Sequence, residues 1–256
     1  MMKTFTNSLA GLILLALTFN TAEAQTKGNG NVISQERQLT SFDGIDVGSA
    51  INLFVSQGGK QSVKVETDEN LQEKVITRVE SGTLTLSSRN IKNSTKLNVY
   101  VTIPVLNRLE ASGASEVKGL TPFKSDNFEL SCTGASEVSL EITSHSLKNN
   151  ISGASEVKLK VSAQEINTEA SGASEIELSG TAKLQKIDLS GAMEQNSADL
   201  VTEITSGKLS GASDCTINAT KQINIHLSGA SSIEYSDHGK KKKITENGQY
   251  DFPLDK

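Results

Sequence analysis

A short motif of the form S-G-A-S-E-V recurs seven times between residues 112 and 233 of this chain, and it constrains the fold more than any other feature. The motif glycines are spaced 21, 19, 19, 19, 20 and 18 residues apart, and they are Gly113, Gly134, Gly153, Gly172, Gly191, Gly211 and Gly229. This period is shorter than that of two-helix repeats or propeller blades. A unit of two or three short strands cannot bury its own apolar face, so neighbouring copies must stack.

Aliphatic residues alternate with polar ones on both sides of each motif. Val157 and Leu159 follow the third copy, and Ile187 and Leu189 precede the fifth. This period of two is typical of half-buried strands. Each repeat is therefore predicted to form a strand, a glycine corner, a second strand and a polar turn such as residues 179–182. Stacked coils of this kind predict an all-β fold, a right-handed parallel β-helix or β-solenoid with coils of about 19 residues.

Residues 1–24 have the pattern of a secretory signal peptide. Lys3 precedes an apolar run at residues 9–19, and Ala22 and Ala24 supply the small residues of a cleavage site. The apolar run is too short for a membrane span, and no later run approaches that length. We therefore expect an exported protein without an integral membrane span, located in the periplasm, on the outer-membrane surface or outside the cell.

The rest of the chain falls into three predicted parts. Residues 25–105 are β-rich but irregular, and they are predicted to start and cap the solenoid, because end coils must differ from the repeats to prevent edge-to-edge growth. Residues 106–236 hold the seven-repeat solenoid, and the polar residues 237–256 form a C-terminal cap or tail. Within this tail, the lysine run 240–243 is expected to be a solvated turn.

Two features of the N-terminal part give more local expectations. Residues 48–53, Gly-Ser-Ala-Ile-Asn-Leu, look like a degenerate copy of the motif. Residues 68–75 are expected to form one short helix, with Asp68 as its N-cap.

The two cysteines invite a disulfide in an exported protein, but the repeat register argues against one. Cys132 lies two residues before its motif glycine, whereas Cys215 lies four residues after its own and four coils further along. Four strand spacings amount to about 19 Å, and a disulfide requires Cα atoms within about 7 Å. Both thiols are therefore predicted to be free and buried.

One acidic residue holds the same register in six of the seven copies: Glu116, Glu137, Glu156, Glu175, Glu194 and Asp214. In stacked coils these carboxylates would lie about 5 Å apart and repel each other by about 1 kcal/mol in water. The side chains either splay into solvent or are bridged by divalent cations, and Ca²⁺ suits such oxygen ligands. No other cofactor is expected. The fifth copy carries Met193 for Ser and Gln195 for Val, which predicts a local bulge, with a binding feature as the alternative.

The composition argues against several classes of function. With 25 Lys+Arg against 30 Asp+Glu, the chain lacks the basic excess that a nucleic-acid-binding surface requires. It has no Trp, three Tyr and seven Phe, which is few for a protein that stacks on sugars or bases. His145, His226 and His238 lie in no recognisable catalytic motif, and the motif serines recur too often to be nucleophiles. We therefore expect no enzymatic activity.

Residues 42–55 read Phe-Asp-Gly-Ile-Asp-Val-Gly-Ser-Ala-Ile-Asn-Leu-Phe-Val. Together with the S-G-A-S-E-V repeats that follow, this segment resembles the putative auto-transporter adhesin, head GIN domain family, and the resemblance covers residues 35–240. It implies a β-helix-like solenoid and an exported protein of the kind typical of the Bacteroidetes group. It also implies an adhesive role.

Export, repeats and the lack of catalytic motifs together favour a non-catalytic adhesion or binding module of the cell envelope or cell surface. Its partner would be a protein or glycan at the cell surface, of unknown identity. A structural envelope scaffold that self-associates through its ends or faces is the first alternative. A polysaccharide-active β-helix enzyme and an ice-binding protein are further alternatives, and the Ser and Ala of the repeats, where Thr would be expected, argue against the latter.

Overall fold

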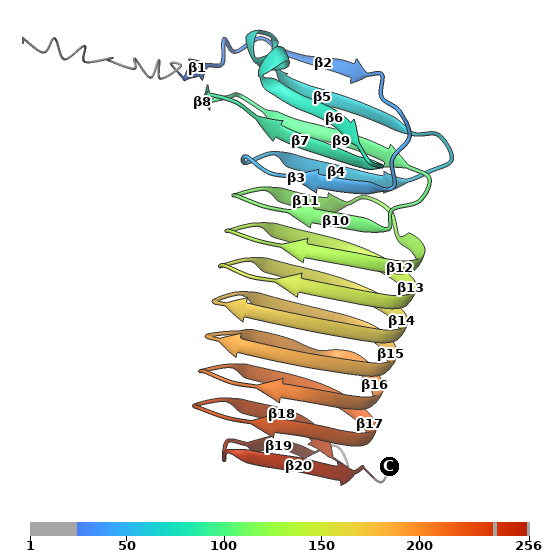
Figure 1. Cartoon of the computed structure of the whole chain (residues 1–256), viewed down its shortest axis with the longest axis vertical. Helices are drawn as coiled ribbons and strands as arrows, with labels where there is room; N and C mark the ends of the chain where they lie inside the picture. Colours follow the sequence, from blue (N-terminus) through green and yellow to red (C-terminus); the bar gives the residue numbers. More distant parts are fainter. Residues whose placement is uncertain (1–24, 238–239, 255–256) are drawn as a thin grey trace, which may run out of the picture.

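The computed structural model describes residues 25–237 and 240–254, so the predicted signal peptide lies outside the described residues. The chain forms an elongated stack of coils with a cap at each end (Figure 1). Within the described residues, one 18-stranded sheet runs through the whole stack, and a second sheet joins β1 (Thr26–Lys27) to β8 (Ile91–Lys92). The stacked parallel coils confirm the predicted all-β solenoid.

Parallel strands of the repeats build the central part of the stack. Each strand pairs in register with its equivalent in the next coil, so that Val138, Val157 and Ile176 lie in one row. The strands are β10 (Arg108–Ala111), β11 (Glu116–Gly119), β12 (Phe123–Cys132), β13 (Glu137–Ile151), β14 (Glu156–Gly172), β15 (Glu175–Gly191), β16 (Glu194–Leu209), β17 (Asp214–Leu227) and β18 (Ser232–Asp237).

Each coil from β13 onwards turns once sharply, at the motif glycine, and once gradually, in the middle of a long strand. Figure 1 shows the sharp corners along one edge of the stack and the gradual bends along the other. The predicted polar turn at residues 179–182 is therefore wrong. These residues belong to β15, because their backbone groups remain paired with residues 160–163 of β14 throughout the bend.

Aliphatic side chains from the two sides of each coil fill the interior. Val157, Leu159 and Val161 of β14 all point inward and are at most 2% exposed. Full burial of such a side chain contributes about 1.5–3 kcal/mol, and the repeats supply a row of them at every inward position. The alternation seen in the sequence is therefore the alternation between core and surface.

Each corner glycine of the later coils packs closely against the backbone of the glycine in the preceding coil. Gly153 has a φ of 89°, a conformation that residues with a Cβ rarely adopt. A Cβ built on Gly153 would lie 2.4 Å from the carbonyl oxygen of Gly134. That oxygen accepts a hydrogen bond from Ala154 N at 2.7 Å, so the hydrogen-bond ladder continues around the corner.

The fifth coil carries the predicted bulge. The pairing of β15 with β16 shifts register between Glu177 and Ser179, and the pairing of β16 with β17 shifts after Asn196. Gln195 points into the core in place of valine and is 1% exposed. Its Nε2 donates to Ser197 Oγ at 3.0 Å, while its Oε1 has no partner. The bulge therefore accompanies a buried polar cluster.

The N-terminal region contains the first coil and a covering layer. Asn52 and Leu53 pair with Glu116 and Val117, which confirms residues 48–53 as a degenerate copy of the motif. Its corner uses Ser49, with a φ of 60°, where the later copies use glycine. The strands of this region are β2 (Val32–Arg37), β3 (Gly44–Val47), β4 (Asn52–Gln57), β5 (Ser62–Asp68), β6 (Val75–Glu80), β7 (Thr83–Ser88) and β9 (Leu97–Ile103).

Antiparallel pairing distinguishes this covering layer from the repeats. Strand β5 pairs antiparallel with both β2 and β9, and β6 pairs antiparallel with β7. Strands β7 and β9 in turn pair in parallel with β3 and β4, so the layer continues the sheet of the first coil.

The predicted short helix is present as a 3-10 helix, η1 (Glu69–Lys74), but Asp68 does not cap it through its side chain. The buried carboxylate of Asp68 instead accepts hydrogen bonds from Gly30 N and Thr95 N, both at 2.7 Å, and from Thr95 Oγ1 at 2.9 Å. It thereby ties the N-terminal segment to the loop before β9. The expected cap is wrong because these donors, distant in sequence, compete for the same oxygens.

Two antiparallel strands cover the last coil. Strand β19 (Lys240–Ile244) pairs with β18, and β20 (Gly248–Pro253) pairs with β17. The lysine run 240–243 is exposed, but it is a strand and not the predicted turn, because its backbone pairs with β18. Lys243 Nζ also lies 3.9 Å from Glu234 Oε1. In the described part of the chain, no helix is both long and apolar enough to cross a membrane.

Candidate functional site

The two serines of each S-G-A-S corner have different surroundings. The second serine points inward, and Ser115 Oγ donates to the carbonyl of Ser112 at 2.9 Å, which closes the corner. Ser213 and Ser231 make the same bond to Ser210 and Ser228. The second serine is therefore structural, whereas the first serine lies on the surface beside the glycine.

The acidic ladder predicted from the sequence is present on the strands that follow the corners. Its six residues pair in register from coil to coil: Glu116, Glu137, Glu156, Glu175, Glu194 and Asp214. Lys158 Nζ lies 2.6 Å from Glu156 Oε1. This hydrogen bond, together with the nearby charges of Glu177 and Glu137, raises the pKa of Lys158. A lysine thus offsets part of the negative charge midway along the ladder.

Metal-binding side chains do not gather in the described part of the chain, and this holds for the acidic ladder as well. Within residues 25–237 and 240–254, no three or more His, Cys, Asp or Glu side chains form a group that could hold a metal ion.

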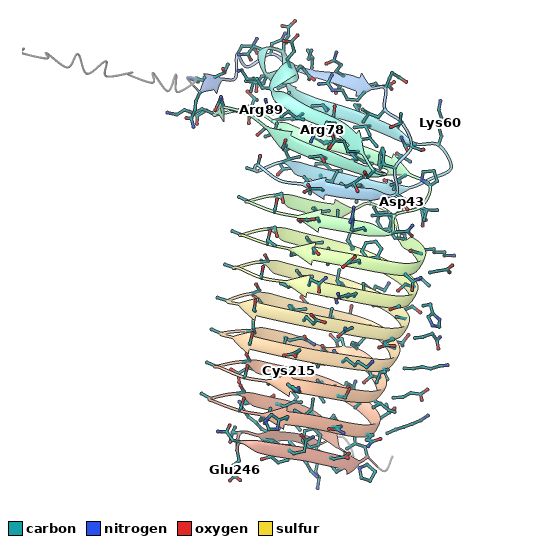
Figure 2. The ribbon with its side chains drawn as sticks, in the orientation of Figure 1. Asp43, Lys60, Arg78, Arg89, Cys215 and Glu246 are labelled. Carbon is teal, nitrogen blue, oxygen red and sulfur yellow. The ribbon has the colours of Figure 1, made fainter. Side chains whose placement is uncertain are left out.

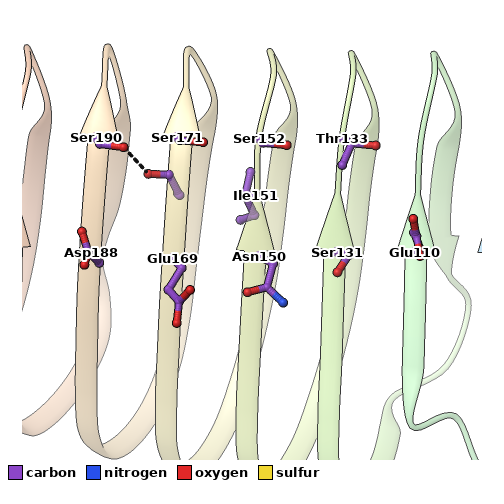
Figure 3. Close-up of a pocket in the computed structure, with 11 residues that line it drawn as sticks. Glu110, Ser131, Thr133, Asn150, Ile151, Ser152, Glu169, Ser171, Asp188 and Ser190 are labelled. Atoms are coloured by element: carbon purple, nitrogen blue, oxygen red, sulfur yellow. Dashed lines mark hydrogen bonds between the residues drawn. The ribbon is translucent and has the colours of Figure 1, made fainter.

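A groove lies on the other side of the glycine corners, along the strands that lead into them (Figure 3). It has a volume of about 440 Å³ and runs across the coils from β10 to β15. One side is a row of hydroxyls, and the other is a row of carboxylate, amide and hydroxyl groups. The rows are Thr133, Ser152, Ser171 and Ser190, and Glu110, Ser131, Asn150, Glu169 and Asp188.

Most polar groups of the groove have no partner within the protein. Among the described residues, the side chains of Glu110 and Asp188 make no hydrogen bond or ion pair, and neither do the hydroxyls of Ser131, Ser152 and Ser171. Three lining groups are exceptions. Ser190 Oγ lies 3.5 Å from the carbonyl of Ala170 (Figure 3). Asn150 Nδ2 donates to Glu129 Oε1 at 3.2 Å, and Glu169 Oε1 accepts from Asn167 Nδ2 at 3.5 Å. The groove therefore offers hydrogen-bonding groups whose partners can only be solvent or a ligand.

This groove is not apparent from the sequence. The signal in the sequence is the outward position three residues before each motif glycine. In successive copies it carries Glu110, Ser131, Asn150, Glu169, Asp188, Lys208 and His226, of which the first five line the groove. The residue type varies there, so the position does not stand out as a repeat. Only the structure shows that these side chains form a row with the corner hydroxyls.

Two of the few aromatic residues form a cluster on the N-terminal coil. The rings of Phe54 and Tyr100 stack with centroids 5.0 Å apart and an interplanar angle of 17°. Lys64 Nζ lies 4.7 Å from the centre of the Tyr100 ring. The two rings therefore cover each other, and the lysine lies over the tyrosine.

The polar groups beside these rings bind one another. Glu66 accepts hydrogen bonds from Lys96, Asn98 and Tyr100, each at 3.1 Å. Burial alone would raise the pKa of Glu66, but these donors outweigh it and lower the pKa. The cluster thus stabilises the junction of β5 and β9, and it leaves fewer free groups for a ligand than the groove does.

The cysteines and histidines do not lie together among the described residues. Cys132 and Cys215 are free and buried, as predicted, and Cys215 lies within the stack (Figure 2). Burial raises the pKa of each thiol to about 12, so neither is a nucleophile at neutral pH. His145 lies on β13 and His226 on β17, four coils apart, while His238 lies outside the described residues.

A family profile described as "Putative auto-transporter adhesin, head GIN domain" matches residues 41–239 of the chain. No curated protein matches the chain.

Several solved structures share the fold. A putative adhesin from Parabacteroides distasonis has a TM-score of 0.73 at 23% identity, and the alignment covers 83% of this chain and 95% of that one. A putative adhesin from Parabacteroides merdae has a TM-score of 0.73 at 19% identity, with the same coverage. A putative lipid binding protein from Parabacteroides distasonis has a TM-score of 0.71 at 21% identity, again with 83% and 95% coverage. At these identities the similarity shows the fold alone.

Proposed function

The chain belongs to the putative auto-transporter adhesin, head GIN domain family, and on this basis we propose that it is an exported binding module that mediates adhesion without catalysis. It acts in the periplasm, on the outer-membrane surface or outside the cell. Its partner is a protein or a glycan at the cell surface, not a nucleic acid, because the chain has an excess of acidic residues.

One observation carries this proposal: the groove on the flank of the coil stack holds rows of polar groups, most of which make no hydrogen bond or ion pair within the described residues. Hydrogen bonds around every corner and a continuous aliphatic core keep this row in fixed register. A rigid surface with unpaired polar groups loses little conformational entropy on binding, which favours recognition.

Binding of the purified protein to an array of glycans and extracellular-matrix proteins tests the proposal. Retention on a defined subset of spots is the expected result. Uniform lack of retention, or retention equal to that of an unrelated acidic β-protein, would contradict it.

Running the same array with Ca²⁺ and with a chelator addresses the acidic ladder. If divalent cations bridge the ladder carboxylates, Ca²⁺ should raise the melting temperature, and replacement of Glu156 and Glu175 by Gln should abolish that rise. An unchanged melting temperature means that these side chains are solvated and that Ca²⁺ is no cofactor.

A self-associating envelope scaffold is the second candidate, and the free strand edges favour it. Within the described residues, β6 pairs only with β7 at one end, and β19 pairs only with β18 at the other. Exposed strand edges are templates for association, although the lysine run on β19 opposes contact between two copies of that end. Light scattering over a wide concentration range separates the candidates, since a strict monomer excludes the scaffold.

The polysaccharide-active enzyme remains the least favoured function. His145 and His226 lie on strands four coils apart, and both cysteines are buried. We expect no release of reducing ends from a panel of polysaccharides, and sustained release would contradict this assignment.

A further inference from the structure

We propose that the groove binds a neutral, extended glycan chain that lies along the axis of the stack. This inference rests on the proposed function and names the class of ligand and the surface that takes it. Its basis is the geometry of the groove, the chemistry of its lining and the contrast with the other outward surfaces.

The geometry favours a polymer with a short repeat. The groove crosses the coils from β10 to β15, so equivalent groups recur along it at the strand spacing of about 4.8 Å. The sugar repeat of an extended β-linked glycan is close to this spacing. Successive sugar rings can therefore meet successive coils, as Ser171 and Ser190 lie in register in neighbouring coils. Because alternate rings of an extended β-1,4-linked chain are turned over, equivalent sugar groups would meet every second coil.

The lining chemistry favours sugar hydroxyls. Glu169 and Asp188 lie opposite each other on neighbouring strands, and they present carboxylate acceptors to the groove. Ser152 and Ser171 supply hydroxyls that both donate and accept. Sugar hydroxyls donate well to carboxylates, and such charge-assisted hydrogen bonds are the stronger kind.

The same lining excludes acidic chains. No Lys, Arg or His lines the groove among the described residues, whereas Glu110, Glu169 and Asp188 all do. A uronate or sulfate group would meet the negative charge of these carboxylates, because the first basic residue of the row, Lys208, lies beyond the groove in register with Asp188. The groove also lacks an aromatic ring, so recognition depends on hydrogen bonds and not on stacking.

Other outward surfaces fit such a ligand less well. The acidic ladder contains a lysine ion pair at Lys158, and the polar groups around Glu66 are bonded to one another. The groove combines a concave shape with unpaired donors and acceptors, and it is therefore the surface that a neutral chain would fill.

Affinity electrophoresis and calorimetric titration with soluble neutral glycans test the inference. The probes are a β-1,4-glucan made soluble by hydroxyethyl groups, a β-1,3-glucan and a β-1,4-mannan. A carboxymethylated β-1,4-glucan of similar length is the acidic counterpart. We expect at least one neutral chain to bind and the acidic chain to bind more weakly or not at all.

Two matched double variants locate the site. E169Q/D188N neutralises two groove carboxylates on β14 and β15. E175Q/E194Q neutralises two carboxylates of the acidic ladder, which lie on the other side of the same glycine corners. Loss of charge-assisted hydrogen bonds should weaken glycan binding about tenfold or more in E169Q/D188N. The ladder variant should bind as the unaltered protein does. S171L, which fills the groove without a change in charge, should also abolish binding, and circular dichroism checks that each variant is folded.

Several results would overturn the inference. These are failure of every neutral chain to bind, equal binding of the acidic chain, or binding that is unaffected by both E169Q/D188N and S171L. Capture of oligolysine in place of the glycans, lost in E169Q/D188N, would assign the groove to cationic peptides and overturn it as well. If the protein binds spots on the array but these variants bind equally, the adhesion function stands and the glycan groove does not. If the protein binds nothing, both fail.

Discussion

At the scale of single residues, each position of the motif carries a residue type that packing against the neighbouring coil requires. The glycine is required because the carbonyl of the glycine in the preceding coil occupies the space of a side chain, as with Gly134 beneath Gly153. The second serine is buried because its hydroxyl closes the corner, whereas the first serine is placed at the surface. The motif therefore recurs for packing, and a ligand meets the more variable positions beside it.

Replacement of Gly153 by Ala should destabilise the protein. The new methyl group would lie 2.4 Å from Gly134 O, and the backbone would keep a φ of 89° that alanine disfavours. We expect a loss of about 1–3 kcal/mol in the free energy of unfolding, measured by denaturant titration. Gly59 has open space around it and is the matched control, so Gly59→Ala should change stability by less than about 0.5 kcal/mol. Equal effects of the two substitutions would contradict the corner argument.

Both thiols should be unreactive in the folded protein. Burial raises the pKa of Cys132 and Cys215 to about 12, so almost no thiolate exists at pH 8. We expect an aromatic disulfide reagent to label neither cysteine in buffer and both in denaturant. Rapid labelling of the native protein at either position would show that the stack opens there.

At the scale of strands and coils, the repeats were predictable and the ends were not. Alternation and glycine spacing predicted the coils, and the weak copy at residues 48–53 was recognisable because its paired residues keep the apolar pattern. The antiparallel layer of β2, β5 and β9 could not be predicted, because its pairings join segments far apart in sequence. The lysine run 240–243 resembles a turn in the sequence because four consecutive charged residues lack the apolar alternation of a strand. Its backbone nevertheless pairs with β18 as strand β19.

Asp68 should make the N-terminal layer sensitive to acid. Burial alone raises the pKa of this carboxyl, but hydrogen bonds from Thr95 and Gly30 outweigh it and lower the pKa. A depressed pKa means that the ionised group stabilises the fold above its unfolded pKa, and that this contribution is lost as the pH falls through the folded pKa. D68N should therefore cost about 1–3 kcal/mol at pH 7 and progressively less in acid.

Denaturant titrations of D68N and the unaltered protein between pH 7 and pH 2 check this expectation. D126N is the control, because Asp126 is exposed and its side chain has no hydrogen bond among the described residues. A stability difference that stays constant across this pH range would show that Asp68 does not act through its charge.

The fifth coil should be stabilised by a return to the repeat pattern. Gln195 buries an oxygen without a partner, and Val157 shows that valine fits the equivalent position in the third coil. Q195V should raise the free energy of unfolding by about 1–2 kcal/mol. The reverse change, V157Q, should lower it. A destabilised Q195V would mean that the buried cluster around Ser197 depends on Gln195.

At the scale of the whole molecule, the stack is a rod whose two flanks differ. One flank carries the acidic ladder, which the sequence predicted because its residue type repeats. The other carries the groove, which the sequence did not reveal, because its residue types vary and only lateral stacking brings them together. Figure 2 shows side chains projecting from the caps at both ends, with Arg78 and Lys60 at one and Glu246 at the other. We therefore assign adhesion to the groove flank and not to the ends.

Adhesion by protein-coated beads tests this assignment most directly. Beads carrying the unaltered protein, E169Q/D188N or E175Q/E194Q are applied under shear to surfaces coated with the glycans and matrix proteins of the array. We expect beads with the unaltered protein and with E175Q/E194Q to be held on the same surfaces, and beads with E169Q/D188N to be released. Retention of all three, or of none, would contradict the claim that this rod adheres through its groove.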